Sequence, residues 1–258
     1  MPENNGTRMM LWYKAWRESQ VRFLISVLVL IGICAVVVLL QQSFRAQLHT
    51  RETVLNTYAG YIYLRIYEGF ARGTFLLLAL VLGLGGLQRE RAHGTAGFTL
   101  ALPVSRIRLM AVRAAVGVLQ VAALSLLPLM LVPGLSWFVG QSYPWRQSLE
   151  FSLLWVVVGT AVFAAAFLGS AIFANEYSAL AVSLVAFFTY PLATHLSLLR
   201  RYPLNIHFIM NGIGMPYFDP RTDLLVGPMP WTILSVVAKV AMTFIASTAV
   251  ITRKLDFS

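Results

Sequence analysis

Residues 88–113 form the one long polar interruption between strongly apolar runs that also carries an ordered series of charged, glycine, proline and apolar residues. Glu90 comes first, between two arginines. A Gly-Thr break follows at 94–95, and then a short apolar segment that ends at Pro103. Charges beside one or two apolar side chains on a short helix suit insertion into a groove of another protein. The chemistry predicted for this stretch is therefore recognition and docking.

A new apolar run begins directly after this segment. Ser105 is placed to cap its first turn, and Arg106, Arg108 and Arg113 follow near its start. A short docking helix joined to membrane spans on both sides can pass a rigid-body motion into them. The alternative is a solvated basic loop between two membrane helices, without a partner.

The order of residues in 88–113 resembles the loop between the second and third membrane helices of type 2 ABC exporter permeases. That loop runs roughly Glu-Arg-Glu-x-Gly-Thr-Leu-Glu-x-Leu-Leu-x-Leu-Pro-hydrophobic-Ser-Arg, with a basic residue opening the next helix. The matching positions are Glu90, Arg91, Gly94, Thr95, Phe98, Leu100, Leu102, Pro103, Ser105, Arg106 and Arg113. The sequence departs from the pattern at Ala92, Ala96 and Gly97, and a glycine inside a short helix costs about 1 kcal/mol relative to alanine.

The resemblance implies a coupling helix that docks on a cytoplasmic ATP-hydrolysing subunit. The implied docking residues are Glu90, Arg91, Gly94, Thr95, Phe98, Leu102, Pro103 and Arg106, with Glu176 in the second cytoplasmic turn as a smaller contact. Otherwise Glu176 is simply a solvated acid in a tight turn. ATP and Mg²⁺ would be bound by that partner, and this chain would bind no cofactor. A second permease chain, identical or paralogous, is also implied, because one six-helix unit supplies half of such a transport path.

The composition places the chain in a bilayer. Of its 258 residues, 58% are hydrophobic and 12% are charged, and its mean hydropathy is +0.72. The net charge of +10 could indicate nucleic acid, but the basic residues punctuate apolar runs, which is the pattern of membrane flanks facing lipid headgroups. Membrane lipids are therefore expected partners, and nucleic acid is not.

Six apolar runs predict an all-α integral membrane protein with six transmembrane helices. The expected spans are 23–40, 69–87, 114–133, 151–174, 179–199 and 231–252. Together they form a transmembrane domain over 23–252, followed by a cytoplasmic tail over 253–258. Residues 41–67 look too polar to span, so we expect them outside the membrane with a short helix on the surface. Arg72 is expected to extend to the outer interface.

The N-terminal segment, 1–22, is expected to hold an interfacial amphipathic helix. Met9, Trp12, Tyr13 and Trp16 recur at helical spacing, while basic residues and Glu18 take another face. The resemblance supports an elbow helix at this place; a solvated leader is the alternative. We expect no cleavable signal peptide, because the first apolar run begins only after about 20 polar and amphipathic residues and is long enough to span.

Six spans put both termini on one side of the membrane. Basic residues cluster against the span ends on that side, which predicts cytoplasmic termini in a multi-pass protein of the cell (inner) membrane. The basic residues counted on that side are Arg8, Lys14, Arg17, Arg22, Arg89, Arg91, Arg106, Arg108, Arg113, Arg253 and Lys254.

Two further residues are candidates for a substrate path. Lys239 lies about 12 Å into the last span at 1.5 Å per residue, where a lysine costs about 3 kcal/mol on insertion scales. It therefore either faces a protein interior or wet cavity, or pairs with a carbonyl or extends outward. His195 could join Lys239 in the outer half of the bundle, or simply bond to a neighbouring helix.

No catalytic or metal motif accompanies these features. The sequence has no Gly-x4-Gly-Lys-Ser/Thr for ATP and no His-Glu-x-x-His. Its single cysteine, Cys34, lies in an apolar run and is expected to pack, which leaves no intrachain disulfide. The resemblance implies the permease subunit of an ATP-driven exporter, and the absence of catalytic motifs favours that prediction over an enzyme. The alternatives are an integral membrane enzyme acting on lipids and a non-transporting membrane anchor that recruits an ATPase.

Overall fold

The computed structural model describes residues 5–47, 57–84, 105–173, 176–194, 206–211, 218–219, 224–225 and 229–254. The regular secondary structure of these residues is helical except for one antiparallel pair of two-residue strands, in which Phe218 pairs with Leu225 and Asp219 with Leu224. The elements are α1 (Asn5–Leu39), α2 (Gln41–Gln47), α3 (Tyr58–Ile62), the π-helical turn η2 (Tyr63–Tyr67), α4 (Phe70–Gly83), α7 (Arg106–Phe138), α8 (Trp145–Ile172), α9 (Glu176–Thr194), α10 (Ile206–Asn211), β1 (Phe218–Asp219), β2 (Leu224–Leu225) and α11 (Trp231–Lys254).

Five helical stretches are long and apolar enough to cross a membrane. They are Met9–Leu39, Tyr58–Gly83, Ile107–Phe138, Trp145–Ile172 and Trp231–Thr252. A shorter apolar stretch, Tyr177–Tyr190, lies in α9, and residues 195–199 of the span predicted there are outside the described residues. The prediction of an all-helical, multi-pass membrane protein is confirmed at this level.

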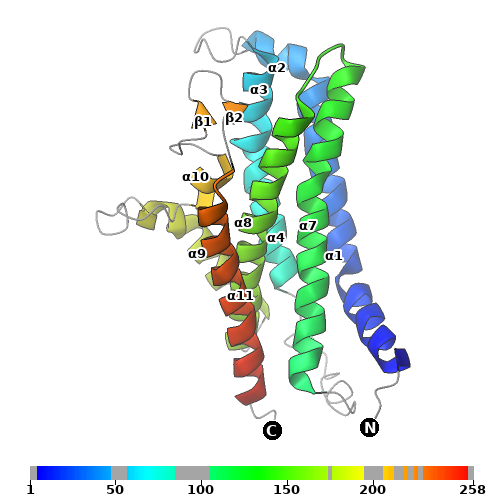
Figure 1. Cartoon of the computed structure of the whole chain (residues 1–258), viewed down its shortest axis with the longest axis vertical. Coiled ribbons are helices and arrows are strands. Elements are labelled where there is room, and N and C mark those ends of the chain that lie inside the picture. Colours follow the sequence, from blue (N-terminus) through cyan, green and yellow to red (C-terminus); the bar gives the residue numbers. More distant parts are fainter. Residues whose placement is uncertain are drawn as a thin grey trace.

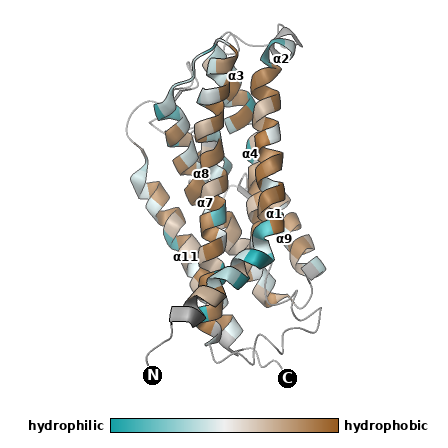
Figure 2. Cartoon of the chain, turned by 90° about the vertical axis from the view of Figure 1, so that its right-hand side faces the viewer, coloured by the Kyte–Doolittle hydropathy of each residue, from teal (hydrophilic) through white to brown (hydrophobic). Residues whose placement is uncertain are grey.

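Helix α8 is the centre of the bundle. It packs against α4, α7, α9, α10 and α11, whereas α1 packs mainly on α7 and α4 (Figure 1). Its most apolar window is 61% buried, compared with 22% for α1 and 17% for α11. Hydrophobic residues, drawn in brown, lie along the lengths of the helices, and hydrophilic residues, drawn in teal, gather in the lower part of α1 (Figure 2). Among the five candidate spans, α1 and α11 are therefore the least covered.

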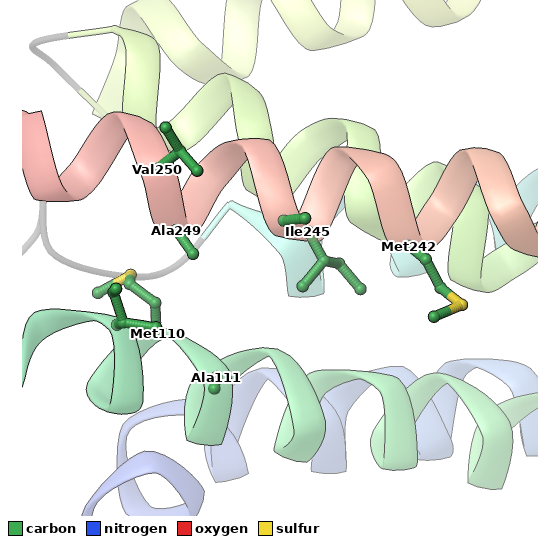
Figure 3. Close-up of a pocket in the computed structure, with 8 residues that line it drawn as sticks. Met110, Ala111, Met242, Ile245, Ala249 and Val250 are labelled. Carbon is green, nitrogen blue, oxygen red and sulfur yellow. The ribbon is translucent and has the colours of Figure 1, made fainter.

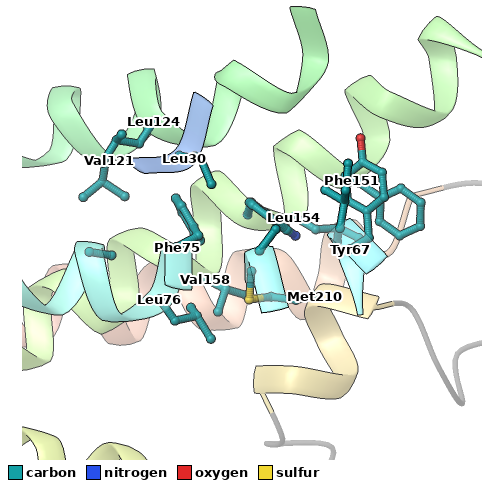
Figure 4. Packing of buried hydrophobic residues seen from close by; sticks show 14 of the residues in the cluster. Leu30, Tyr67, Phe75, Leu76, Val121, Leu124, Phe151, Leu154, Val158 and Met210 are labelled. Atoms are coloured by element: carbon teal, nitrogen blue, oxygen red, sulfur yellow. The ribbon is translucent and has the colours of Figure 1, made fainter. Parts of the chain in front are cut away.

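Stacked aromatic rings fill the core around α8. The ring of Phe75 from α4 stacks on Trp155 with centroids 4.8 Å apart, and Tyr67 stacks on Phe151 at 4.2 Å. Leu30 of α1 and Leu124 of α7 complete this cluster (Figure 4). Cys34, which is also fully buried, packs in the same core as predicted.

The segment Tyr58–Tyr67 corrects one prediction, because it lies inside the bundle rather than outside it. Tyr61, Tyr63 and Tyr67 are each no more than 1% exposed. Their burial is possible because hydroxyl groups find partners: Tyr61 donates to the Val37 carbonyl at 2.8 Å, and Tyr67 is 3.0 Å from the Ser148 hydroxyl. The predicted start of the second span, at residue 69, was therefore too late, because the tyrosines of this segment were counted as polar.

Arg72 also differs from its prediction. Its side chain is partly buried, and its Nε is buried without a hydrogen-bond partner, so the guanidinium does not extend freely to the outer interface. The helix α4 that carries it begins at Phe70, close to the predicted start, but the candidate span to which α4 belongs begins earlier, at Tyr58. Arg72 is consequently deeper in the bundle than expected.

The N-terminal region forms one continuous helix where two elements were predicted. No glycine or proline interrupts residues 7–31, so nothing in the sequence breaks α1 between its amphipathic and apolar parts. Met9 and Tyr13 are exposed, whereas Leu11 and Ala15 face the bundle. An elbow turn is not confirmed, but the exposed aromatic face that an interfacial helix needs is present.

We predict that Gly83→Ala destabilises the bundle, because a Cβ at this position would lie 2.5 Å from the Phe163 carbonyl oxygen and 2.8 Å from Ala166 Cβ. Overpacking of this kind costs about 1–3 kcal/mol. The measurement is the thermal unfolding midpoint in mild detergent. Gly73→Ala in the same helix is the matched control, since nothing lies within 4 Å of its Cβ, and it should be neutral or stabilising. Equal midpoints for the two variants would contradict the close α4–α8 contact.

Candidate functional site

Most of the predicted docking residues lie outside the described residues. These are Glu90, Arg91, Gly94, Thr95, Phe98, Leu102 and Pro103, and His195 is outside as well. Arg106 is the first residue of α7, Glu176 is the first residue of α9, and Lys239 lies within α11. The hydroxyl of Ser105 accepts the Arg108 amide at 3.4 Å, so the predicted cap of α7 is confirmed.

The two helices that flank the docking segment are both tied to α1. Arg22 Nη1 donates to the Leu84 carbonyl at 2.9 Å, directly where the described part of α4 ends. On the other side, Arg113 Nη2 lies 2.8 Å from Glu18 Oε2. One turn of α1 therefore holds the chain on either side of residues 85–104.

Two further contacts complete this α1 junction, which we define as Glu18, Ser19, Arg22, Arg113 and Gln120 with the Leu84 carbonyl. The Gln120 amide donates to Ser19 Oγ at 2.8 Å, and Lys14 Nζ lies 3.7 Å from Glu18. The Arg113 side chain is only 5% exposed, whereas Glu18 is 36% exposed. The buried Arg113 guanidinium is held by the Glu18 carboxylate, which is itself partly exposed to water. This pair fixes α7 against α1.

Sequence reasoning placed Glu18 and Arg22 on the polar face of an interfacial helix and missed this junction. A signal was available, because Arg113 lies well inside an apolar helix, where a charge needs a partner. Glu18 is the only acidic residue between Glu3 and Glu52, so few carboxylates could serve. The pairing itself depends on how α1 and α7 pack, which spacing along the chain does not specify.

Lys239 belongs to a polar stripe on α11. Thr232, Ser235, Lys239 and Thr243 recur every three or four residues, and all four are exposed. Two of the hydroxyls bond back to the helix, Ser235 to the Thr232 carbonyl at 2.7 Å and Thr243 to the Lys239 carbonyl at 2.6 Å. Lys239 thus faces outward from this chain and not into its own bundle. A polar stripe on a membrane helix is stabilised by facing another protein surface or water.

A second polar cluster lies where α10 meets the bundle. Ile209 and Met210 of α10 are at most 2% exposed, and α10 packs against α8. The ring of His207 lies 6.2 Å from that of Phe187 in α9. Burial and, to a smaller extent, the nearby Arg72 guanidinium together lower the pKa of His207 from 6.5 to about 4. His207 is therefore neutral at physiological pH.

The described residues offer no metal site. No group of three or more His, Cys, Asp or Glu side chains in the described part of the chain could hold a metal ion. What the two clusters can do is mechanical and electrostatic: the α1 junction links helices, and the α10 cluster keeps an arginine and a neutral histidine inside the bundle.

We predict that Glu18→Gln lowers the stability of the bundle by about 2 kcal/mol, because Arg113 then keeps its burial and loses a charged acceptor. Arg146→Gln is the matched control: it breaks the Arg146–Glu150 pair, whose arginine is 81% exposed and whose loss costs about 0–1 kcal/mol. The unfolding midpoints in detergent provide the measurement. Exchange of the pair, Glu18→Arg with Arg113→Glu, should recover part of the loss, and no recovery would argue against a direct interaction.

The lowered pKa of His207 predicts a pH dependence. Between pH 6.5 and about 4 the unfolded chain binds a proton that the folded chain does not, so stability falls as the pH decreases through this window and levels off below it. His207→Asn removes this contribution. The difference in unfolding midpoint between pH 7 and pH 5 should therefore be smaller in the variant than in the wild type. An unchanged difference would mean that other groups dominate.

Comparison with known proteins adds no family assignment. No protein-family model matches the sequence, and no curated protein matches it. The docking interpretation therefore rests on the order of residues in 88–113, and the structure contributes a multi-pass helical bundle in which that segment joins α4 to α7.

Proposed function

We propose that the chain is the permease subunit of an ATP-driven ABC exporter of the type 2 class. The observation that carries the proposal is the residue order in 88–113, with its acid and arginines, Gly-Thr break, apolar segment and Pro-x-Ser-Arg ending. This segment would form a coupling helix on a separate cytoplasmic ATPase, which binds ATP and Mg²⁺. Six spans, an N-terminal elbow helix and cytoplasmic termini in the cell membrane belong to the same proposal.

The α1 junction supports a coupling role for this segment. Because Arg22 holds the Leu84 carbonyl and Glu18 holds Arg113, a displacement of the docking segment would act on α1, α4 and α7 together. Rigid helices joined by charged contacts transmit such a motion better than a flexible linker does. Glu176 at the start of α9 would add the smaller second contact.

The uncovered surfaces of α1 and α11 support a second permease chain. These two helices are the least buried of the five candidate spans, and α11 presents the polar stripe with Lys239. In a dimer of identical or paralogous chains, Lys239 would face the partner or the substrate path between the two halves. Such a placement avoids leaving an ammonium group against lipid.

The test is affinity purification of the tagged chain in mild detergent, followed by identification of co-purifying proteins and an ATPase assay. We expect a cytoplasmic ATPase to co-purify, and Phe98→Asp or Glu90→Arg to reduce its recovery by about tenfold or more, as loss of an interface hot spot does. The matched controls are Phe138→Asp and Arg146→Glu, which change exposed residues at the opposite end of α7 and at the start of α8.

Three outcomes would contradict the proposal in different ways. If no ATPase co-purified with the intact chain, the exporter function would be rejected. An integral membrane enzyme acting on lipids would then be the next function to test. Equal loss in docking and control variants would reject the docking site. A stable complex whose ATPase rate ignores every transport substrate offered would favour the non-transporting membrane anchor.

A further inference from the structure

An apolar groove of about 660 Å³ lies between the first turns of α7 and the last turns of α11. Its walls are aliphatic and thioether side chains that point toward one another across the two helices (Figure 3). The lining residues are Ile107, Met110, Ala111, Met242, Ile245, Ala246, Ala249 and Val250. This volume is within the range of about 300–1,000 Å³ that small-molecule sites occupy.

The groove opens sideways and has the depth of one leaflet. Met242, Val250 and Ile107 are 70%, 53% and 45% exposed, so the groove is open toward the surroundings of the bundle. Along α11 it extends from residue 242 to residue 250, about 12 Å at 1.5 Å per residue. That is close to half of a hydrocarbon core of about 30 Å.

Arginine positions border one end of the groove, which we call the lower end, where α1 begins and α11 ends in Figure 1. Arg253 lies three positions after Val250, on the groove-bearing face of α11, and Arg108 lies three positions before Ala111, at the edge of the groove-bearing face of α7. At the other end of the groove, Lys239 lies three positions before Met242 on α11. The groove thus combines apolar walls with positive charge at its mouth.

This combination fits a lipid better than a second copy of the chain. Two copies related by a twofold axis along the membrane normal would bring their lower ends together at the same depth, so that Arg108 and Arg253 would meet the same arginines of the partner. Like charges facing each other there would be unfavourable. A phosphate at the mouth and an acyl chain between the walls satisfy both features of the groove.

We propose that the α7–α11 groove binds an anionic phospholipid of the bilayer, with an acyl chain along the apolar walls and the phosphate beside Arg108 and Arg253. The lipid covers Met242 and Ile245 and links α7 to α11 at the end where the docking segment enters α7. This inference does not depend on the proposed function, because it requires neither an ATPase nor a transported substrate.

The experiment is native mass spectrometry of the chain alone, released from nanodiscs that contain equal amounts of phosphatidylglycerol and phosphatidylcholine. The wild type should retain phosphatidylglycerol in preference to phosphatidylcholine. Arg108→Gln with Arg253→Gln should reduce that preference by about tenfold or more, because each basic residue near the headgroups favours anionic lipid by about fivefold. Arg17→Gln with Arg146→Gln, which also removes two exposed arginines but at positions away from the groove, is the charge-matched control and should leave the preference unchanged.

A second pair of variants tests the walls. Ala246→Trp fills the groove and should reduce retention of both lipids, whereas Leu119→Trp, at an exposed position of α7 away from the groove, should not. The charge variant needs no change in packing, so it remains informative if Ala246→Trp fails to fold. No preference for phosphatidylglycerol in the wild type would overturn the proposal, as would equal losses in test and control variants. It would also be overturned if the variants changed only the proportion of dimer.

Discussion

The bundle depends on polar groups finding partners across helix pairs, because hydrocarbon offers them none. Tyr58 reaches the hydroxyl of Ser136 at 2.7 Å, and Tyr67 reaches that of Ser148, so two long-range contacts are made by phenols buried between helices. The same requirement operates on charge at the α1 junction, where Glu18 accepts Arg113. Each of these bonds joins elements that are far apart in the sequence, and each sets the register in which the apolar surfaces meet.

Different interactions hold the two helices in place: the aromatic core packs around α8, and the α1 junction holds α1. Around α8, stacked rings supply large buried area and leave little free volume, as the close approach of Gly83 to the Phe163 carbonyl demonstrates. Around α1, whose most apolar window is 22% buried, charged and polar contacts replace area. Farther along α1, Leu30, Cys34 and Val38 are fully buried and belong to the same core as the aromatic residues around α8.

The exposed surface of the bundle is chemically uneven. The N-terminal half of α11 carries Lys239 and most of the polar stripe, whereas its C-terminal half forms the apolar groove with α7 and ends in basic residues. Lipid satisfies an apolar surface beneath a positive rim, but it does not satisfy an ammonium group within the hydrocarbon. We therefore assign the two halves of α11 to different neighbours: a protein partner or substrate path for Lys239, and an anionic lipid for the groove.

The sequence by itself determined the membrane class, the all-helical fold and the cap at Ser105, because length, apolar content and capping chemistry act locally along the chain. The boundaries of the spans were harder to predict. Tyr58–Tyr67 is buried because its hydroxyl groups meet partners on other helices, whereas hydropathy counts such residues as polar. The docking role of residues 88–104 is a prediction that rests on their order alone. The Glu18–Arg113 pair, the burial of α10 and the outward direction of Lys239 were decided only by the tertiary structure, since each depends on which helix faces rotate toward one another.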